Sequence, residues 1–247
     1  MHLRNTILIL FVAIFFITCS KDGASGETSG GTGTGGSLAR FTIASNHLYL
    51  ADYRTIEVYD ISNPQNPVRK NPVSISFPVE TIYPYQDKLF IGSTNGMFIY
   101  SIKNPSSPVL IGQATHVRSC DPVVAQNNMA YVTLRGGAAC GPAEDGLYIY
   151  DITSITSPVQ KSLFKISTPN GLGIKDTVVF VCRGTNGLSL VNVKNGSAPK
   201  LMYTVSDGNY IDVIPIDNLL ITYMSNGLLI YDVSNLNQVV KIGAINY

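Results

Sequence analysis

Residues Gly227 to Ser234 read Gly-Leu-Leu-Ile-Tyr-Asp-Val-Ser, and this stretch decides the fold because related stretches recur along the chain. The recurrences lie at 56–62 (IEVYDIS), 96–103 (GMFIYSIK), 146–153 (GLYIYDIT) and 187–194 (GLSLVNVK). The equivalent positions Tyr59, Tyr100, Tyr150, Val191 and Tyr231 are separated by 41, 50, 41 and 40 residues. A fixed period of this length predicts a repeat architecture, with an insertion of about nine residues in the third repeat.

Each repeat divides into four short strands, as the last repeat illustrates. Its expected strands are 211–216, 219–224, 227–233 and 239–245. Asn226-Gly227 separates the second strand from the third, and Asn-Gly favours a type I′ hairpin because both residues accept a positive φ. Four antiparallel strands in each repeat of about forty residues are typical of propeller blades.

We therefore predict an all-β fold, a single β-propeller of about five four-stranded antiparallel blades after a signal peptide and a flexible linker. The expected domain is 38–247, with approximate repeats at 38–78, 79–120, 121–169, 170–209 and 210–247. A partner chain or a degenerate blade that completes six blades is the alternative. Because the chain begins with a first strand and ends with a fourth, we expect packing between the first and last blades to close the ring.

The N-terminus has the organisation of a signal peptide over residues 1–18. Arg4 precedes an apolar run from Ile7 to Ile17, which is too short to span a bilayer comfortably. The sequence Phe16-Ile17-Thr18-Cys19 resembles a lipobox, in which the cysteine is lipidated, although Phe16 and Thr18 depart from the usual Leu and small residue. An ordinary signal peptide and an uncleaved anchor are the alternatives.

Residues 19–37 contain the expected lipidation site, Cys19, and a Gly/Ser/Thr-rich tether. Ser20 after the cysteine looks like an outer-membrane sorting signal. We therefore expect a protein that a lipid anchors to the outer membrane, with its domain facing either the periplasm or the cell surface.

The repeated pattern of an apolar run, Tyr-Asp-Ile or Tyr-Asp-Val and a proline-containing loop resembles the LVIVD-repeat family of bacterial surface proteins. The stretches 119–122 (SCDP), 130–135 (AYVTLR) and 147–152 (LYIYDI), with Cys140 between the last two, are the most similar. The resemblance covers residues 38–247, and repeat four departs from the pattern with Val191-Asn192-Val193. It implies a propeller fold and no catalytic residues.

Three cysteines remain once Cys19 is assigned to the lipid. Cys120 precedes the first strand of repeat three and Cys140 lies in its insertion, so both are expected at the same face of the propeller. We predict a Cys120–Cys140 disulfide, because the compartment permits one. Cys182 lies within an expected strand and is interpreted as a small buried hydrophobe. Three free thiols, or pairing of Cys182 with a partner, are the alternatives.

Composition excludes several functions. The formal net charge is +1, and no basic cluster is interleaved with aromatic residues, so we expect no nucleic-acid partner. The chain has three histidines, one of them in the signal peptide, and no P-loop or Gly-x-Ser-x-Gly motif. The sequence therefore predicts no metal site and no cofactor.

The first strands of successive repeats begin around the mouth of the central channel, where polar residues are expected to converge. These residues are Arg40, Glu80, Asp121, Asn170 and Asp212, to which neighbouring segments add Arg118, Arg135, Arg183 and Glu144. Such a group could bind a small polar ligand, a sugar or a cation, and the alternative is that its members are solvated or pair with one another. Glu80, Asp121 and Asp212 could also supply a carboxylate pair for glycoside cleavage.

The function we expect is a non-catalytic binding module that presents a propeller face to a protein or glycan while a lipid holds it at the membrane. An envelope glycan hydrolase or lyase that uses the channel-mouth carboxylates is the alternative. Asp60, Asp151 and Asp232 recur at one place in the repeat and are interpreted as turn residues, because their short side chains bond nearby backbone groups.

Overall fold

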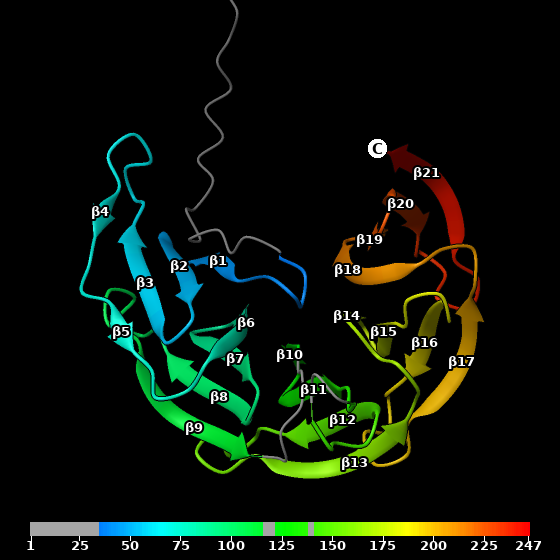
Figure 1. Cartoon of the computed structure of the whole chain (residues 1–247), viewed down its shortest axis with the longest axis horizontal. Helices are drawn as coiled ribbons and strands as arrows, with labels where there is room; N and C mark the ends of the chain where they lie inside the picture. Colours follow the sequence, from blue (N-terminus) through cyan, green and yellow to red (C-terminus); the bar gives the residue numbers. More distant parts are fainter. Residues whose placement is uncertain (1–34, 116–121, 138–140) are drawn as a thin grey trace, which may run out of the picture.

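The computed structural model describes residues 35–115, 122–137 and 141–247, which form five antiparallel sheets. The sheets fan out around a common axis as the blades of a propeller (Figure 1), and each contains a meander of four strands. Blade 1 has a fifth short strand that also pairs with its third strand. The described residues contain no helix. The predicted all-β propeller of five blades is confirmed.

The first strand of each blade is innermost and the fourth is outermost (Figure 1). Blade 1 contains β1 (Phe41–Ala44), β2 (His47–Asp52), β3 (Thr55–Asp60), β4 (Val68–Arg69) and β5 (Val73–Ser74). Blade 2 contains β6 (Val79–Tyr85), β7 (Lys88–Ser93), β8 (Gly96–Ser101) and β9 (Val109–Thr115). Blade 3 contains β10 (Val123–Gln126), β11 (Met129–Leu134), β12 (Gly146–Asp151) and β13 (Val159–Lys165). Blade 4 contains β14 (Leu172–Lys175), β15 (Val178–Cys182), β16 (Leu188–Asn192) and β17 (Lys200–Val205). Blade 5 contains β18 (Tyr210–Ile216), β19 (Leu219–Met224), β20 (Gly227–Asp232) and β21 (Val240–Asn246).

The recurrent aspartate after the third strand closes a turn. Asp60, Asp151 and Asp232 each accept a hydrogen bond from the backbone N–H two residues later, at 3.0, 2.9 and 2.8 Å. Asn192 and Ser101 accept the same bond in the two other blades. The short side chain thus ends the strand and turns the chain toward the fourth strand. The interpretation of these residues as turn residues is confirmed.

The Asn-Gly pairs form a different hairpin from the one expected. In blade 5 the turn residues are Ser225 and Asn226, and the positive φ falls on Gly227 (147°), which is already the first residue of β20. A side chain at Gly227 would collide with the backbone carbonyl of Ile245 on the neighbouring strand. The type I′ prediction was therefore wrong. The glycine is required because the outer strand approaches closely, and not because the turn needs two residues with positive φ.

Alternate residues of each blade face its two neighbours. We call the face turned to the next blade the forward face, exemplified by Tyr49, and the face turned to the preceding blade the backward face, exemplified by Leu89. The described residues contain four buried apolar clusters, and each joins the forward face of one blade to the backward face of the next. The aromatic residues that fill the centre of the forward face are Tyr49, Phe90, Tyr131 and Phe180, at most 5% exposed.

Blades 1 and 5 are not joined by the blade-to-blade packing that we expected. Blades 1 and 5 lie at the two ends of an arc (Figure 1), and no fifth apolar cluster between them occurs among the described residues. Polar contacts connect them instead. The Ser37 hydroxyl and the Leu38 N–H, which precede β1, donate hydrogen bonds to the Asp212 carboxylate in β18, at 2.9 and 3.1 Å. The segment 35–39 lies between β1 and β18, so the faces of the end blades do not pack as the others do.

We expect the acid sensitivity of the turns to depend on the recurrent aspartate. Hydrogen bonds from Thr153 and from Lys161 lower the pKa of Asp151 to about 2. Because the pKa is lower in the folded state than in the unfolded one, the stabilisation is present above about pH 4 and is lost as the pH falls toward 2. The difference in melting temperature between wild type and Asp151→Asn should therefore shrink over that window.

Asp217→Asn is the control, since Asp217 is exposed and its carboxylate forms no hydrogen bond or ion pair that the structure shows among the described residues. Its melting temperature should stay close to that of wild type, because the substitution removes no side-chain hydrogen bond that the structure shows in that part of the chain. Equal pH courses for the two variants would contradict the assignment.

Candidate functional site

The N-terminal segment before β1 occupies the channel mouth between the innermost strands. The Ser37 hydroxyl donates to Asp212 and accepts a hydrogen bond from the Leu172 N–H of blade 4 at 2.7 Å. The carbonyl of Ala39 accepts a hydrogen bond from the Ile82 N–H of blade 2 at 2.9 Å. One short segment is thereby bonded to blades 2, 4 and 5.

Asp212 is a buried acceptor at the centre of these contacts. One carboxylate oxygen accepts from Ser37 and from its own neighbour Val213, and the other accepts from Leu38. Burial raises the pKa of Asp212, and the hydrogen bonds oppose that rise. Because Asp212 is only 8% exposed and both oxygens are engaged, it holds the segment in place and is not presented to a solvent-borne substrate.

The predicted arginines bond within the propeller. The Arg135 guanidinium donates to the Asn170 side-chain oxygen, so these two predicted residues do meet. The Arg183 guanidinium donates to the backbone and hydroxyl oxygens of Ser167 and to the Ser189 hydroxyl. Glu144 is exposed and forms an ion pair with Lys165 at 2.6 Å. These four mouth residues therefore pair with nearby groups of the propeller, which is the alternative that the sequence left open.

The other predicted residues are distributed as follows. Arg40 is exposed immediately before β1, and its carbonyl accepts a hydrogen bond from the Ala51 N–H. Glu80 in β6 is half-buried. Cys19, Cys120, Cys140, Asp121 and Arg118 lie outside the described residues, so the lipidation site and the disulfide stay predictions. Cys182 is fully buried and unpaired, and burial raises the pKa of its thiol.

Within the described ranges, no group of three or more His, Cys, Asp and Glu side chains is placed to hold a metal ion. Over the same part of the chain, no helix is long and apolar enough to cross a bilayer.

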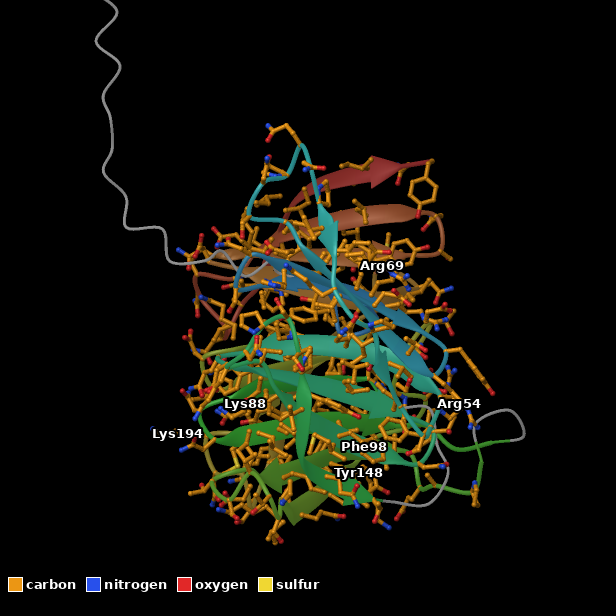
Figure 2. The ribbon with its side chains drawn as sticks, turned by 90° about the vertical axis from the view of Figure 1, so that its left-hand side faces the viewer. Arg54, Arg69, Lys88, Phe98, Tyr148 and Lys194 are labelled. Carbon is orange, nitrogen blue, oxygen red and sulfur yellow. The ribbon has the colours of Figure 1, made fainter. Side chains whose placement is uncertain are left out.

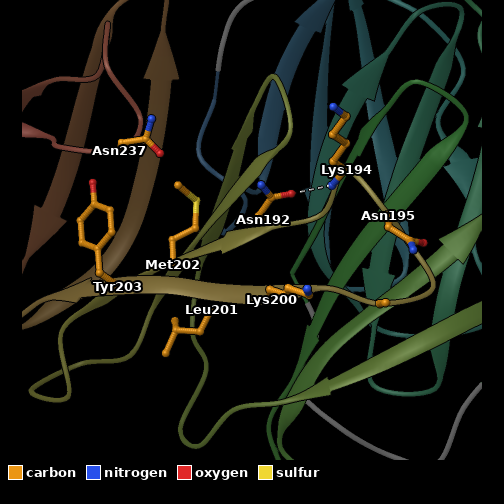
Figure 3. A pocket seen from close by; sticks show the side chains of 9 residues that line it. Asn192, Lys194, Asn195, Lys200, Leu201, Met202, Tyr203 and Asn237 are labelled. Carbon is orange, nitrogen blue, oxygen red and sulfur yellow. Dashed lines mark hydrogen bonds between the residues drawn. The ribbon is translucent and has the colours of Figure 1, made fainter.

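The opposite face of the propeller carries a groove that the sequence did not reveal. This face bears the recurrent turns after the third strands, and Lys88 and Lys194 lie toward it whereas Arg54 lies toward the other edge (Figure 2). The groove has a volume of about 940 Å³ and follows β17 of blade 4. Its lining residues, most of them labelled in Figure 3, are Asn192, Lys194, Asn195, Ala198, Lys200, Leu201, Met202, Tyr203 and Asn237. We call it the blade-4 groove.

The blade-4 groove combines a positive, amide-rich rim with an apolar floor. Lys194 and Lys200 are exposed, and the structure gives neither ammonium a carboxylate partner among the described residues. Met202 and Tyr203, which pack against the apolar cluster between blades 4 and 5, form the floor, whereas Leu201 points to the other side of β17 (Figure 3). The Tyr203 hydroxyl is fixed by a hydrogen bond to the Leu236 carbonyl at 3.1 Å. This arrangement can accept negatively charged and hydroxyl-bearing groups above an apolar surface.

Blade 3 differs from blade 4 in charge at the same place, because Thr153 and Val159 occupy the positions of Lys194 and Lys200. A smaller hollow of about 500 Å³ lies at the same position there, but Asp151 neutralises Lys161 at 3.1 Å. Blade 4 has Asn192 at the position of Asp151, and the amide still makes the turn. The departure of repeat four from the Tyr-Asp pattern was the one sequence signal that could have identified this groove.

Comparisons with known proteins agree with the fold. A profile of the LVIVD repeat matches residues 35–74 and 85–115, within blades 1 and 2. The search of curated proteins finds no match. A solved protein from Lactobacillus plantarum is similar over 82% of this chain and 69% of its own, with 14% identity and a TM-score of 0.63. The periplasmic gluconolactonase PpgL of Pseudomonas aeruginosa is similar over 81% and 67%, with 12% identity and a TM-score of 0.63.

The computationally designed protein Ika8 is also similar, over 83% of this chain, with 11% identity and a TM-score of 0.59. The chain covers only 60% of the length of that protein. At these identities the similarities concern the fold alone.

Removal of the Ser37 hydroxyl should destabilise the propeller. Ser37→Ala leaves the buried Asp212 carboxylate without one donor and the Leu172 N–H without its acceptor, which should cost about 1–3 kcal/mol. Urea unfolding measures the loss. Ser107→Ala is the control because Ser107 is exposed, and this variant should unfold like wild type. An unchanged midpoint for Ser37→Ala would show that the segment does not hold the channel mouth.

Proposed function

We propose that this LVIVD-repeat protein is a lipid-anchored protein of the cell envelope whose propeller binds an anionic glycan in the blade-4 groove. The observation that carries the proposal is the pair of lysines, Lys194 and Lys200, that rim an apolar floor without carboxylate partners among the described residues. Ammonium groups attract carboxylate or phosphate substituents, and the amides of Asn195 and Asn237 can bond sugar hydroxyls.

The floor of the groove supports the same ligand class. The side chain of Tyr203 is oriented by its bond to Leu236 and lies beside Met202 (Figure 3). A sugar ring presents apolar C–H faces that can lie on such a surface, while its hydroxyls reach the rim. A protein partner would likewise meet a polar rim around an apolar centre. The binding experiment described below distinguishes a protein ligand from a glycan.

The enclosure of Asp212 supports a binding role over glycoside cleavage. Asp212, one of three carboxylates that the sequence offered for cleavage, is enclosed by Ser37, Leu38 and Val213. A glycosidase needs two carboxyl groups on either side of the scissile bond. The similarity to a gluconolactonase concerns the fold and carries no residue of its chemistry to this chain.

The anchor can be tested by labelling. Cys19→Ser removes the only acceptor that the lipobox-like sequence offers, so incorporation of radioactive palmitate should be lost and the protein should move from the membrane to the soluble fraction. Cys182→Ser is the control, since this cysteine is buried in β15 and should not change labelling. Labelling that persists in Cys19→Ser would refute the anchor.

The groove can be tested with polygalacturonate as the acidic probe and dextran as the neutral one. Wild type should bind polygalacturonate more tightly than dextran, and Lys194→Ala and Lys200→Ala should each weaken it about two- to five-fold, as expected for an exposed ion pair. Isothermal titration calorimetry at low salt measures both.

Lys103→Ala is the matched control, because Lys103 occupies the position of Lys194 in blade 2 and is also exposed. It should bind as wild type does. An equal loss in Lys103→Ala would indicate unspecific charge attraction. Failure to bind either polysaccharide, together with capture of an envelope protein through Lys194 and Lys200, would replace the glycan by a protein ligand.

A further inference from the structure

Four of the five turns after the third strands contain an asparagine at the same place. Its backbone carbonyl accepts a hydrogen bond from the N–H three residues later, at 2.9 to 3.1 Å, which makes the turn a β-turn. The four residues, from blades 1, 2, 4 and 5, are Asn63, Asn104, Asn195 and Asn235. All four are exposed, so water reaches each side-chain amide.

Blade 4 differs from the other three in the residue that follows this asparagine. Gly196 follows Asn195, whereas Pro64 and Pro105 stand at that place in blades 1 and 2 and Leu236 in blade 5. Asparagine is chemically labile because the backbone nitrogen of the next residue can attack its side-chain carbonyl carbon. Proline has no N–H to lose, and a leucine side chain hinders an approach that glycine leaves open. Blade 4 alone therefore combines the exposed turn asparagine with an unhindered attacking nitrogen.

Four other asparagines precede a glycine, but the structure restrains those glycines. Gly96 and Gly227 are the first residues of β8 and β20 and pair with the preceding strand. The N–H groups of Gly171 and Gly187 donate to backbone carbonyls at 3.0 and 3.2 Å. The N–H of Gly196 forms no hydrogen bond that the structure shows within the described ranges. The Asn195–Gly196 pair is thus the least restrained of the five.

The side-chain carbonyl of Asn195 is oriented by the turn. Its Oδ1 accepts a hydrogen bond from the Ser197 N–H at 3.1 Å, which withdraws electron density from the carbon that would be attacked. Asn235 accepts the equivalent bond from the Asn237 N–H at 3.0 Å. The two asparagines therefore share the turn and its side-chain bond, and they differ in the residue that follows.

We propose that Asn195 is a deamidation site, and that its conversion to a carboxylate lowers the affinity of the blade-4 groove for anionic ligands. The nitrogen of Gly196 bonds to the side-chain carbonyl carbon of Asn195, and the bond from that carbon to Nδ2 breaks. The proton of the attacking nitrogen leaves with Nδ2 as ammonia, and a succinimide ring remains. One water molecule then opens the ring to aspartate or isoaspartate, so the sequence of steps consumes water, releases ammonia and involves no oxidation or reduction.

The effect on ligand binding rests on the function proposed above. Asn195 lines the groove next to Lys194, and Lys200 lies on the same rim (Figure 3). A carboxylate at this place supplies the negative partner that the ammonium groups lack, as Asp151 does for Lys161 in blade 3 at 3.1 Å. The groove then attracts carboxylate or phosphate groups less strongly.

Peptide mapping by mass spectrometry, during incubation of the full chain in mildly alkaline buffer, tests the modification without any ligand. Asn195 should deamidate faster than Asn235 and faster than the four asparagines whose following glycines are restrained. Isoaspartate should appear in the peptide that contains position 195, because only the ring intermediate produces it.

Gly196→Pro removes the attacking N–H with little change to the turn. Pro64 and Pro105 occupy this place in blades 1 and 2, and a side-chain carbon at Gly196 would come no closer than 3.4 Å to its nearest neighbour, Met129. The Gly196 carbonyl can still accept its hydrogen bond from the Ser162 hydroxyl. The variant should melt as wild type does and should lose deamidation at Asn195.

The polygalacturonate titration measures the consequence for the groove. Asn195→Asp should bind about two- to five-fold more weakly than wild type, as expected for one exposed charge. Wild type that has been aged should weaken in proportion to its deamidated fraction, and aged Gly196→Pro should not weaken. Asn235→Asp is the matched control, because it places a carboxylate in the same turn of blade 5, outside the residues that line the groove. It should bind as wild type does.

The outcomes separate the modification from the proposed function. Deamidation of Asn195 no faster than that of Asn235, or deamidation that persists in Gly196→Pro, would overturn the modification site. Unchanged affinity in Asn195→Asp, in an assay where Lys194→Ala weakens binding, would overturn the link to the groove. If wild type does not bind polygalacturonate, the proposed function and the effect on affinity both fail, whereas the mass spectra still decide the modification.

Discussion

The packing of one sheet face on the next is the interaction on which the rest of this structure depends. A single four-stranded sheet of this size cannot bury both of its apolar faces, so each blade is stable only between neighbours. The alternation of side chains along β7, β11 and β15 divides each blade into a forward and a backward set. This division fixes the order of the blades, places the innermost strands around the axis and leaves the two end blades with one uncovered face each.

The sequence contained most of the fold, because local features specify it. The period of the Tyr-Asp stretch predicted the number of blades, and the strands of blade 5 begin and end within one residue of their expected bounds. The hairpin type was not predictable from Asn-Gly alone. The need for glycine at Gly227 comes from the carbonyl of Ile245, which a later strand brings near.

Contacts between distant residues explain what the sequence did not show at the channel mouth. Ser37 and Asp212 are separated by 175 positions, and no repeat pattern relates a residue before β1 to one in β18. Arg135 and Asn170 were expected near each other because both lie close to the axis, and they do meet. The blade-4 groove was missed although it depends on a local exchange and not on a distant contact. Asn192 makes the same turn as Asp151, so the exchange leaves the fold unchanged and alters only the charge of that face.

The segment 35–39 has a mechanical consequence. A force applied through the residues that precede Gly35 reaches Ser37 first, and its hydrogen bonds lead to Leu172 of blade 4 and Asp212 of blade 5. The load is therefore divided between innermost strands near the axis, and it does not peel an outer strand such as β4 away from its edge. Bonds that are loaded together resist tension better than bonds that break in turn, so a pull on this segment would have to break contacts to two blades at once.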